Sequence, residues 1–287
     1  MKKFIWSAIT AAMLGASAQA ADLIQPEVVQ APAEVQVASV SGWYLRGDAS
    51  YSIMKMRGAH YFITQDVTGT VDNGTFDSTK LDNTASIGAG VGYQFNNYIR
   101  SDVTLDYTFR TTFNGSTQGG CGVSTACTSR DIAHMTMFSL LANAYVDLGT
   151  YGSVTPYVGA GLGATHVSWD GDNNTSCAND GSGCDPTFQH EGRESWRFTY
   201  ALMAGASIDV TCNLKADVGY RYRHVNSGPM FGSIYFSGSQ ANVGPGFDKG
   251  FDIHEVRSGI RYQFGDSCQT AYLPPVDLPQ AQTPVFK

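Results

Sequence analysis

Residues 255–264, with the sequence EVRSGIRYQF, decide the fold, because apolar and charged side chains alternate along them. One parity is apolar apart from Ser258 and holds Val256, Ile260, Tyr262 and Phe264. The other parity, around Gly259, holds Glu255, Arg257, Arg261 and Gln263. A period of two predicts a β-strand with one apolar and one charged face. Taken alone, this strand fits either a soluble sheet, with charge towards water, or a membrane barrel, with charge towards an interior.

Seven further segments show the same alternation, at residues 43–53, 85–95, 99–110, 132–148, 154–169, 196–209 and 214–223. The connections between consecutive segments alternate strictly between long polar loops and short turns. The long connections lie at 55–83, 111–131, 170–194 and 225–250, and the short turns at 96–97, 149–153 and 211–213. This order predicts an all-β fold, an eight-stranded antiparallel up-and-down barrel with its long loops at one end.

The distribution of charge and glycine predicts that the barrel crosses a membrane. Only 15% of the residues are charged, and the charged parity also carries glycines such as Gly159 and Gly161. A soluble lipocalin-like barrel is the alternative, but it would turn the apolar parity inwards, whereas small and paired charged residues fit an interior better. Aromatic residues near both strand ends, as at Tyr93 and Phe198, are typical of the two bilayer interfaces. We therefore expect a transmembrane β-barrel with long extracellular loops.

The chain is predicted to have four parts. Residues 1–20 begin with Lys2 and Lys3, continue with an apolar run and end in small residues, as a secretory signal peptide does. Residues 21–41 form a proline-containing periplasmic tether, 42–264 the barrel, and 265–287 a proline-rich periplasmic tail. No later run is apolar enough for a spanning helix, so the mature chain would cross as strands. The net charge of −7, without a basic cluster, excludes nucleic acid as a predicted partner.

The charged parity predicts a lumen network of nearly balanced charge. An eight-stranded barrel is just filled by its side chains, so a wide channel is not expected. Buried ions must then pair, which favours structural salt bridges; an ion pathway is the alternative. The predicted network consists of Arg46, Asp48, Arg100, Asp102, Asp106, Arg110, Asp209, Lys215, Asp217, Arg221, Glu255, Arg257 and Arg261.

Six cysteines in an exported chain indicate disulfides. Cys121 and Cys127 share one predicted loop and Cys177 and Cys184 another, whereas Cys212 and Cys268 both fall at the turn end of the barrel. The barrel wall separates the two ends, so this topology predicts the pairs 121–127, 177–184 and 212–268. A metal site is the weaker alternative, because neither close pair has C-x-x-C spacing.

Histidines lie only in the long connections or near the loop-side ends of strands, and His134, His166, His224 and His254 are candidate haem or metal ligands. Histidine is also common at the polar rims of barrels that bind no ligand. We therefore predict no cofactor, with haem as the alternative. Ser168 lies two residues from His166, but no motif completes a catalytic triad. We predict no catalytic residue and no enzyme.

A family resemblance follows from three segments. Arg257, Gly259, Tyr262 and Phe264 resemble the terminal signal that the bacterial outer-membrane assembly machinery recognises. Together with PYVGAG at 156–161 and NAY at 143–145, the region 42–264 resembles the small surface-antigen barrels of Brucella, Bartonella and rhizobia, within the OmpA-like superfamily. One departure is that residues 265–287 follow the signal. The predicted mature start at Ala21 resembles those of alphaproteobacterial barrels that are joined to peptidoglycan.

The resemblance implies an outer-membrane location in a Gram-negative bacterium, with lipid, lipopolysaccharide and the assembly machinery as partners. We expect a non-enzymatic surface antigen that supports envelope integrity, joined to peptidoglycan through Ala21. A haem-binding protein or a protein that binds host surface molecules is the first alternative. A small-solute porin is the second.

Overall fold

The computed structural model describes residues 41–65, 71–235 and 241–265. The predicted signal peptide, the tether up to residue 40 and the tail from residue 266 lie outside these residues. The same holds for Ala21 and Cys268, so peptidoglycan attachment and the pairing of Cys212 with Cys268 stay predictions. Among the described residues, no helix is long and apolar enough to cross a membrane.

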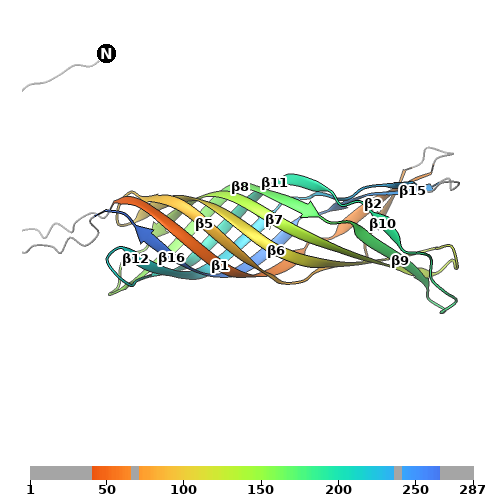
Figure 1. The fold of residues 1–287 in the computed structure, drawn as a ribbon, viewed down its shortest axis with the longest axis horizontal. Helices are drawn as coiled ribbons and strands as arrows, with labels where there is room; N and C mark the ends of the chain where they lie inside the picture. The colour runs from red at the N-terminus through yellow and green to blue at the C-terminus, as the bar shows by residue number, and fades with distance from the viewer. Residues whose placement is uncertain (1–40, 66–70, 236–240, 266–287) are drawn as a thin grey trace, which may run out of the picture. The chain divides into compact units, whose positions relative to one another are not determined.

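Eight antiparallel strands form a closed ring (Figure 1). Each pairs with the next along the chain, and the last also pairs with the first, from Tyr44 opposite Gln263 to Met56 opposite Phe251. This closed ring confirms the predicted barrel. Its strands are β1 (Gly42–Met56), β5 (Thr84–Gln94), β6 (Ile99–Gly119), β7 (Cys127–Asp147), β8 (Val154–Trp169), β11 (Glu194–Asp209), β12 (Leu214–Val225) and β16 (Phe251–Gln263).

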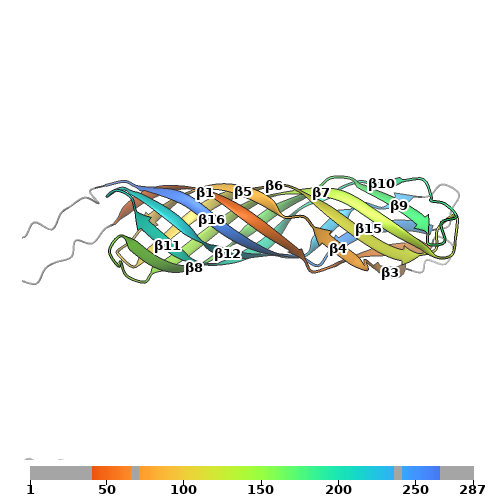
Figure 2. The ribbon, with the colours of Figure 1, turned by 90° about the horizontal axis from the view of Figure 1, so that it is seen from below.

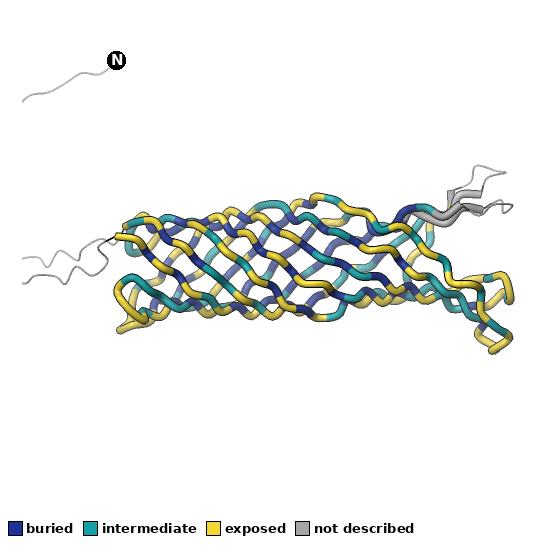
Figure 3. The backbone as a smooth tube through the Cα atoms, in the orientation of Figure 1, coloured by how far each residue is buried: buried dark blue, intermediate teal, exposed yellow. Residues whose placement is uncertain are grey.

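The apolar parity of the strands faces outwards and the charged parity faces inwards. In β16, Val256 and Ile260 are 65% and 61% exposed, whereas Glu255 and Arg261 are 0% and 2% exposed. Figure 3 shows this alternation of exposed and buried positions along the barrel strands. An apolar outer wall around a polar interior is the arrangement of a barrel in lipid, so the soluble lipocalin-like alternative is wrong.

Aromatic rings mark both ends of the apolar wall. Trp43 packs edge-on against Tyr93 at the turn end, with 5.3 Å between ring centroids, and Tyr262 lies 5.2 Å from Phe264. At the other end, Tyr107 lies 5.4 Å from Phe109. Amphipathic aromatic residues favour the boundary between lipid and water, so the two groups mark the two interfaces of the bilayer.

The long connections, predicted as polar loops, contain short strands. β6 and β7 run on past the barrel and are joined there by short strands β4 (Ser78–Leu81), β9 (Asp172–Ala178) and β10 (Phe188–His190). A second sheet is formed by β2 (Ala59–Gln65), β3 (Val71–Thr75), β13 (Gly228–Phe231), β14 (Ile234–Tyr235) and β15 (Ala241–Asp248). We call these short strands and the outer halves of β6 and β7 the crown, seen at the end of the barrel opposite the short turns (Figure 2).

The crown forms because the long β6–β7 ladder presents two edges that short polar strands can pair with. β4 pairs with β6 from Ser78 opposite Ser116, and β9 pairs with β7 from Cys127 opposite Ala178. Backbone hydrogen bonds hold these strands regardless of side-chain polarity. The polar composition of the segments therefore hid their strand structure.

Arg110 was wrongly predicted to lie in the lumen. The pairing of β6 with β7 is irregular between Thr108 and Thr111, so Phe109 and Arg110 are both exposed and the inward parity resumes at Thr111. Arg110 instead donates to Asp170 on the outside, with Nη2 2.6 Å from Oδ2. A β-bulge of this kind adds one residue and reverses the faces beyond it.

Candidate functional site

The barrel lumen is filled by paired charges in its middle. Arg46 on β1 lies 2.8 Å from Asp48 and 2.9 Å from Asp102 on β6. Arg257 contacts the same Asp48 at 3.1 Å, and Asn143 donates to Asp102 at 2.8 Å. Each carboxylate thus has a guanidinium partner, which offsets much of the cost of burying the charge.

A second cluster lies towards the crown. Arg221 binds Asp106 through two N–H groups, at 2.9 and 3.1 Å, and also donates to Glu255. Arg223 shares Glu255 at 2.9 Å and donates to Ser139. Arg221, Arg223 and Glu255 are completely buried. The fork geometry of arginine suits such bidentate pairing better than lysine would.

Arg100 lies between two tyrosine rings at the turn end of the lumen. Its guanidinium carbon is 4.4 Å from the Tyr145 ring centre and 4.6 Å from that of Tyr157, and Nε is 3.1 Å from Asp147. Arg261 pairs with Asp217 nearby at 3.3 Å. Cation–π contact and an ion pair together hold each charge, so these groups close the lumen with side chains.

Most of the predicted lumen residues lie inside, with Arg110 excluded by the bulge. Lys215 and Asp209 pair with each other but remain partly exposed near the turn end. The predicted network omitted Arg223 and Asp147, although both share the inward parity of their strands and that signal was in the sequence. The tertiary structure alone decides which charges meet, as with Asp106 and Arg221, which are 115 residues apart.

An apolar plug separates the charged lumen from the crown. It consists of fourteen buried side chains from barrel and crown strands: Met54, Ala59, Leu81, Phe113, Ala133, Met135, Met137, Val167, Trp169, Val225, Met230, Phe231, Phe251 and Ile253. Phe113, Trp169 and Phe231 form its centre, with ring centroids 5.6 to 6.2 Å apart. The plug blocks the barrel mouth at the same end as the long connections.

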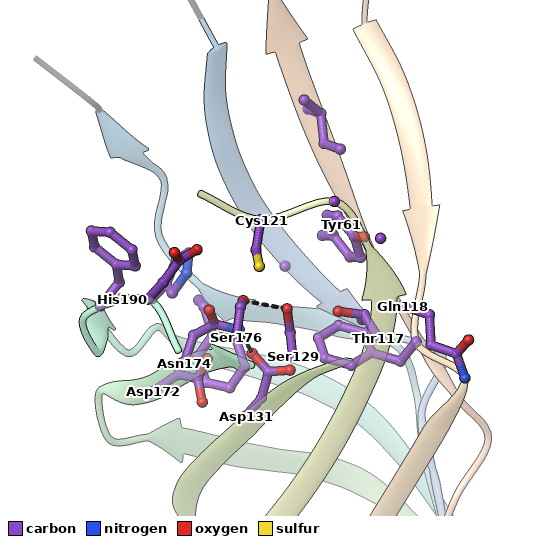
Figure 4. A pocket seen from close by; sticks show the side chains of 18 residues that line it. Tyr61, Thr117, Gln118, Cys121, Ser129, Asp131, Asp172, Asn174, Ser176 and His190 are labelled. Carbon is purple, nitrogen blue, oxygen red and sulfur yellow. Dashed lines mark hydrogen bonds between the residues drawn. The ribbon is translucent and has the colours of Figure 1, made fainter. Parts of the chain in front are cut away.

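A cavity of about 400 Å³ lies in the crown above the plug (Figure 4). Tyr61 from β2 and Phe188 from β10 contribute to its lining, and Phe231 belongs to both the plug and the cavity. Ser129 on β7 and Ser176 on β9 face each other across the ladder and hydrogen-bond through their hydroxyls. The cavity continues the inward parity of β7 beyond the membrane-spanning part, which is why polar and aromatic side chains converge there.

Two buried carboxyl groups, Asp131 and Asp172, line this cavity with 4% and 1% exposure. They lie on paired strands, because Asp131 of β7 is opposite Asn174 of β9 and Asp172 is two residues before Asn174. The Asn174 amide donates to Asp131 at 2.7 Å. Oδ2 of Asp131 and Oδ1 of Asp172 receive no hydrogen bond from any other group in the described part of the chain, and the two carboxyl groups hydrogen-bond to each other when one of them is protonated.

The two groups strongly influence each other's protonation. Burial and, to a smaller extent, the neighbouring Asp131 together raise the pKa of Asp172 to about 8. Burial also raises the pKa of Asp131, which is opposed by the Asn174 amide and by His190. Two carboxyl groups at hydrogen-bonding distance cannot both ionise easily, so they share a proton near neutral pH.

Two disulfides lie at the outer tip of the crown. Cys121 is bonded to Cys127, at the start of β7, and Cys177 of β9 is bonded to Cys184. Both close short loops of the crown beside the cavity, and Cys121 contributes to its lining. They cross-link a part of the molecule that has few buried apolar residues of its own.

The candidate histidines are spread over the barrel rim and do not converge. His224 contacts Asp252 at 2.7 Å, and His254 hydrogen-bonds the Tyr220 hydroxyl. His134 lies 3.4 Å from the Thr112 hydroxyl. No group of three or more metal-ligating side chains exists in residues 41–65, 71–235 and 241–265. Haem binding stays the alternative that it was in the sequence analysis.

Ser168 and His166 both contact Glu194 on the outer wall. The Ser168 hydroxyl donates to Glu194 at 2.7 Å, and Nε2 of His166 lies 3.7 Å from the same carboxylate. A nucleophile needs a base within hydrogen-bonding reach, and here the carboxylate lies next to both groups. In a serine triad the histidine lies between the serine and the carboxylate, whereas here the Glu194 carboxylate lies between Ser168 and His166.

Comparison with known proteins agrees with this architecture. Residues 8–264 match the family described as "Outer membrane protein beta-barrel domain". An uncharacterized protein of Brucella abortus is 38% identical over 270 residues, which cover 86% of this chain and 93% of that protein. A Rickettsia bellii protein named "Putative adhesin" is 29% identical over 236 residues, which cover 77% of this chain and 87% of its own length.

A solved structure shares the fold. The outer membrane protein OprG of Pseudomonas aeruginosa superposes with a TM-score of 0.50 at 14% identity, over 78% of this chain and 97% of OprG. The match to Brucella relatives also confirms the predicted resemblance. A closed barrel with an apolar outer wall, together with these matches, shows that the chain belongs to the outer-membrane β-barrel family of Gram-negative bacteria.

Proposed function

We propose that this protein is a non-conducting barrel that holds an ordered binding surface, the crown, outside the outer membrane. The observation that carries the proposal is the continuation of β6 and β7 past the lipid-facing wall into paired strands with two disulfides. Outer-membrane barrels place their long connections outside the cell. Mobile loops lose entropy when they bind, whereas a preformed surface loses less.

The adhesin name of the Rickettsia relative supports a binding role of this kind, with host surface molecules as the partner class. The porin alternative is disfavoured by the side chains inside the barrel. Paired charges fill its middle, and Phe113, Trp169 and Phe231 lie across its mouth. The role in envelope integrity stays a prediction, as does attachment to peptidoglycan through Ala21, which lies outside the described residues.

The test is attachment of bacteria that display the protein. Cells of a non-adherent strain would carry the full chain or a variant in which residues 112–133, the outer β6–β7 hairpin, are replaced by a two-residue turn. We expect attachment to cultured cells or matrix-coated plates above the empty strain for the full chain and near background for the variant. Heat-dependent gel mobility controls for barrel folding. Equal attachment of all three strains would contradict the proposal.

Conductance measurements test whether the barrel is non-conducting. In planar bilayers the purified full chain should give no unitary current steps under conditions in which a general porin does. Regular steps that persist in independent preparations would overturn the non-conducting part of the proposal and favour the small-solute porin.

A further inference from the structure

We propose that the crown cavity binds a small organic cation whose ammonium or guanidinium group lies against the carboxyl groups of Asp131 and Asp172. This inference rests on the proposed binding role of the crown and names the chemical class of a ligand for it. The cavity of about 400 Å³ is within the size range of small-molecule sites, which are mostly apolar with a few convergent polar groups.

The two cavity acids lack the arginine partner that buried acids have in the lumen, although His190 lines the same cavity. In the lumen, the buried Asp106 has Arg221 and the buried Asp217 has Arg261. Within the described part of the crown, no lysine or arginine forms an ion pair with Asp131 or Asp172, although both are as deeply buried. Without such a partner the two acids hold a shared proton, and a cation from solution could replace this proton and compensate the second charge.

The walls of the cavity are partly aromatic. Aromatic rings from four parts of the crown, those of Tyr61, Phe76, Phe188 and Phe231, line the same cavity as the two carboxyl groups. Aromatic faces attract ammonium and guanidinium groups, and they also cover the aliphatic part of an organic cation. A cavity lined by both carboxyl groups and aromatic rings is complementary to an alkylammonium or alkylguanidinium ion.

Other ligand classes fit this cavity less well. Calcium prefers six to eight oxygen ligands, and the described residues offer no cluster of three metal-ligating acids, cysteines or histidines. Anions would meet two carboxyl groups. A neutral molecule could fill the space but would leave the carboxyl groups without compensation of charge. An organic cation is the class that satisfies both the charge and the apolar walls.

Binding of a cation should displace the proton that the acid pair holds. The titratable groups that line the cavity are Tyr61, Asp131, Asp172, Asp185 and His190, and Asp185 accepts a hydrogen bond from the Gly122 backbone at the rim. The pKa of Asp172 is about 8, so near pH 7 the pair keeps a proton that a bound cation makes unfavourable. Affinity should therefore rise with pH, by up to about tenfold per unit between pH 6 and 8.

The experiment is calorimetry on the full chain in lipid nanodiscs. The probes are 1,5-diaminopentane and propylguanidine, and 1-pentanol is the neutral control. We expect both cations to bind and the alcohol not to bind. At pH 7, titration in buffers of different ionisation enthalpy should show release of close to one proton per bound cation. Equal binding of pentanol, or no proton release, would overturn the inference.

Variants locate the site. Asp172→Asn and Asp131→Asn should each weaken cation binding at least about tenfold, because each removes one charge from the pair. The matched control is Asp180→Asn, the same chemical change at an exposed turn beyond β9 that does not line the cavity. Hydrogen exchange of β9 would verify that the variant crowns are folded. Unchanged affinity in folded Asp172→Asn protein would place the cation elsewhere and overturn the inference.

The two proposals fail separately. Cation binding by purified protein without cell attachment would contradict only the attachment role. Attachment that persists in Asp172→Asn cells, together with a lack of cation binding by the full chain, would contradict only the cavity inference.

Discussion

The lumen and the crown cavity both bury carboxyl groups, but they do so in opposite ways. In the lumen Asp106 receives two N–H groups from Arg221, so its charge is neutralised within the chain. In the crown Asp131 accepts a hydrogen bond from the neutral amide of Asn174 and lies beside a second acid, Asp172. A built-in partner thus offsets the cost of burying a carboxyl group in the lumen, whereas the lack of an arginine partner in the crown leaves a place for a cation from solution.

The largest expected effect comes from removing a lumen partner. Arg221→Met leaves Asp106 and Glu255 buried without their shared guanidinium, and removing one member of a buried pair costs about 3–5 kcal/mol. The free energy of unfolding, measured with urea in lipid vesicles, should fall by about that amount.

The matched control for this change is Arg110→Met on the outer surface. Arg110 and Asp170 are 60% and 55% exposed, so their pair should contribute about 0–1 kcal/mol. If both variants unfolded at the same urea concentration as the unchanged protein, the lumen network would not be a source of stability.

A smaller effect should follow from opening a crown disulfide. Cys177 and Cys184 are separated by 7 residues, and closing a loop of that size stabilises by about 2–3 kcal/mol in the chain-entropy account. In Cys177→Ser/Cys184→Ser protein, amide exchange in β9 and β10 should accelerate about 30-fold or more. Exchange in β1 and β16 should not change, because the closed ring of hydrogen bonds holds them. Faster exchange throughout the barrel would show that crown and barrel are one cooperative unit.

The smallest expected effect is the change in crown stability over the single pH unit from 7 to 8. Because the pKa of folded Asp172 is raised to about 8 from 3.8, the folded crown keeps a proton that the unfolded chain has already released above pH 4. Crown stability should therefore fall as pH rises from about 4 to about 8 and level off beyond it, by about 1 kcal/mol between pH 7 and 8.

Exchange of β9 amides, corrected for the intrinsic pH dependence of exchange, measures this loss. In Asp172→Asn protein the fall should be strongly reduced, whereas Asp180→Asn should behave as the unchanged protein does. An equally steep fall in all three proteins would assign the titration to another group.

Much of the barrel was predictable because the period of two is a local property. In β16 the alternation of Val256 and Ile260 with Glu255 and Arg261 identifies a strand and its two faces without any knowledge of its neighbours. The crown was not predictable in this way, because β9 and β10 carry mainly Asn, Thr, Ser and Gln and show no apolar period. Their strand structure depends on the edge that β7 presents.

The sequence by itself therefore determined the eight membrane strands, the parity that faces lipid and the polar character of the interior. Tertiary structure alone decided which charges meet, since Arg221 and Asp106 are 115 residues apart. It also decided that a bulge turns Arg110 outwards, and that Asp131 and Asp172 lie together in a cavity. The reason is that alternation records only the face on which a side chain lies, whereas register and pairing between distant strands determine its partner.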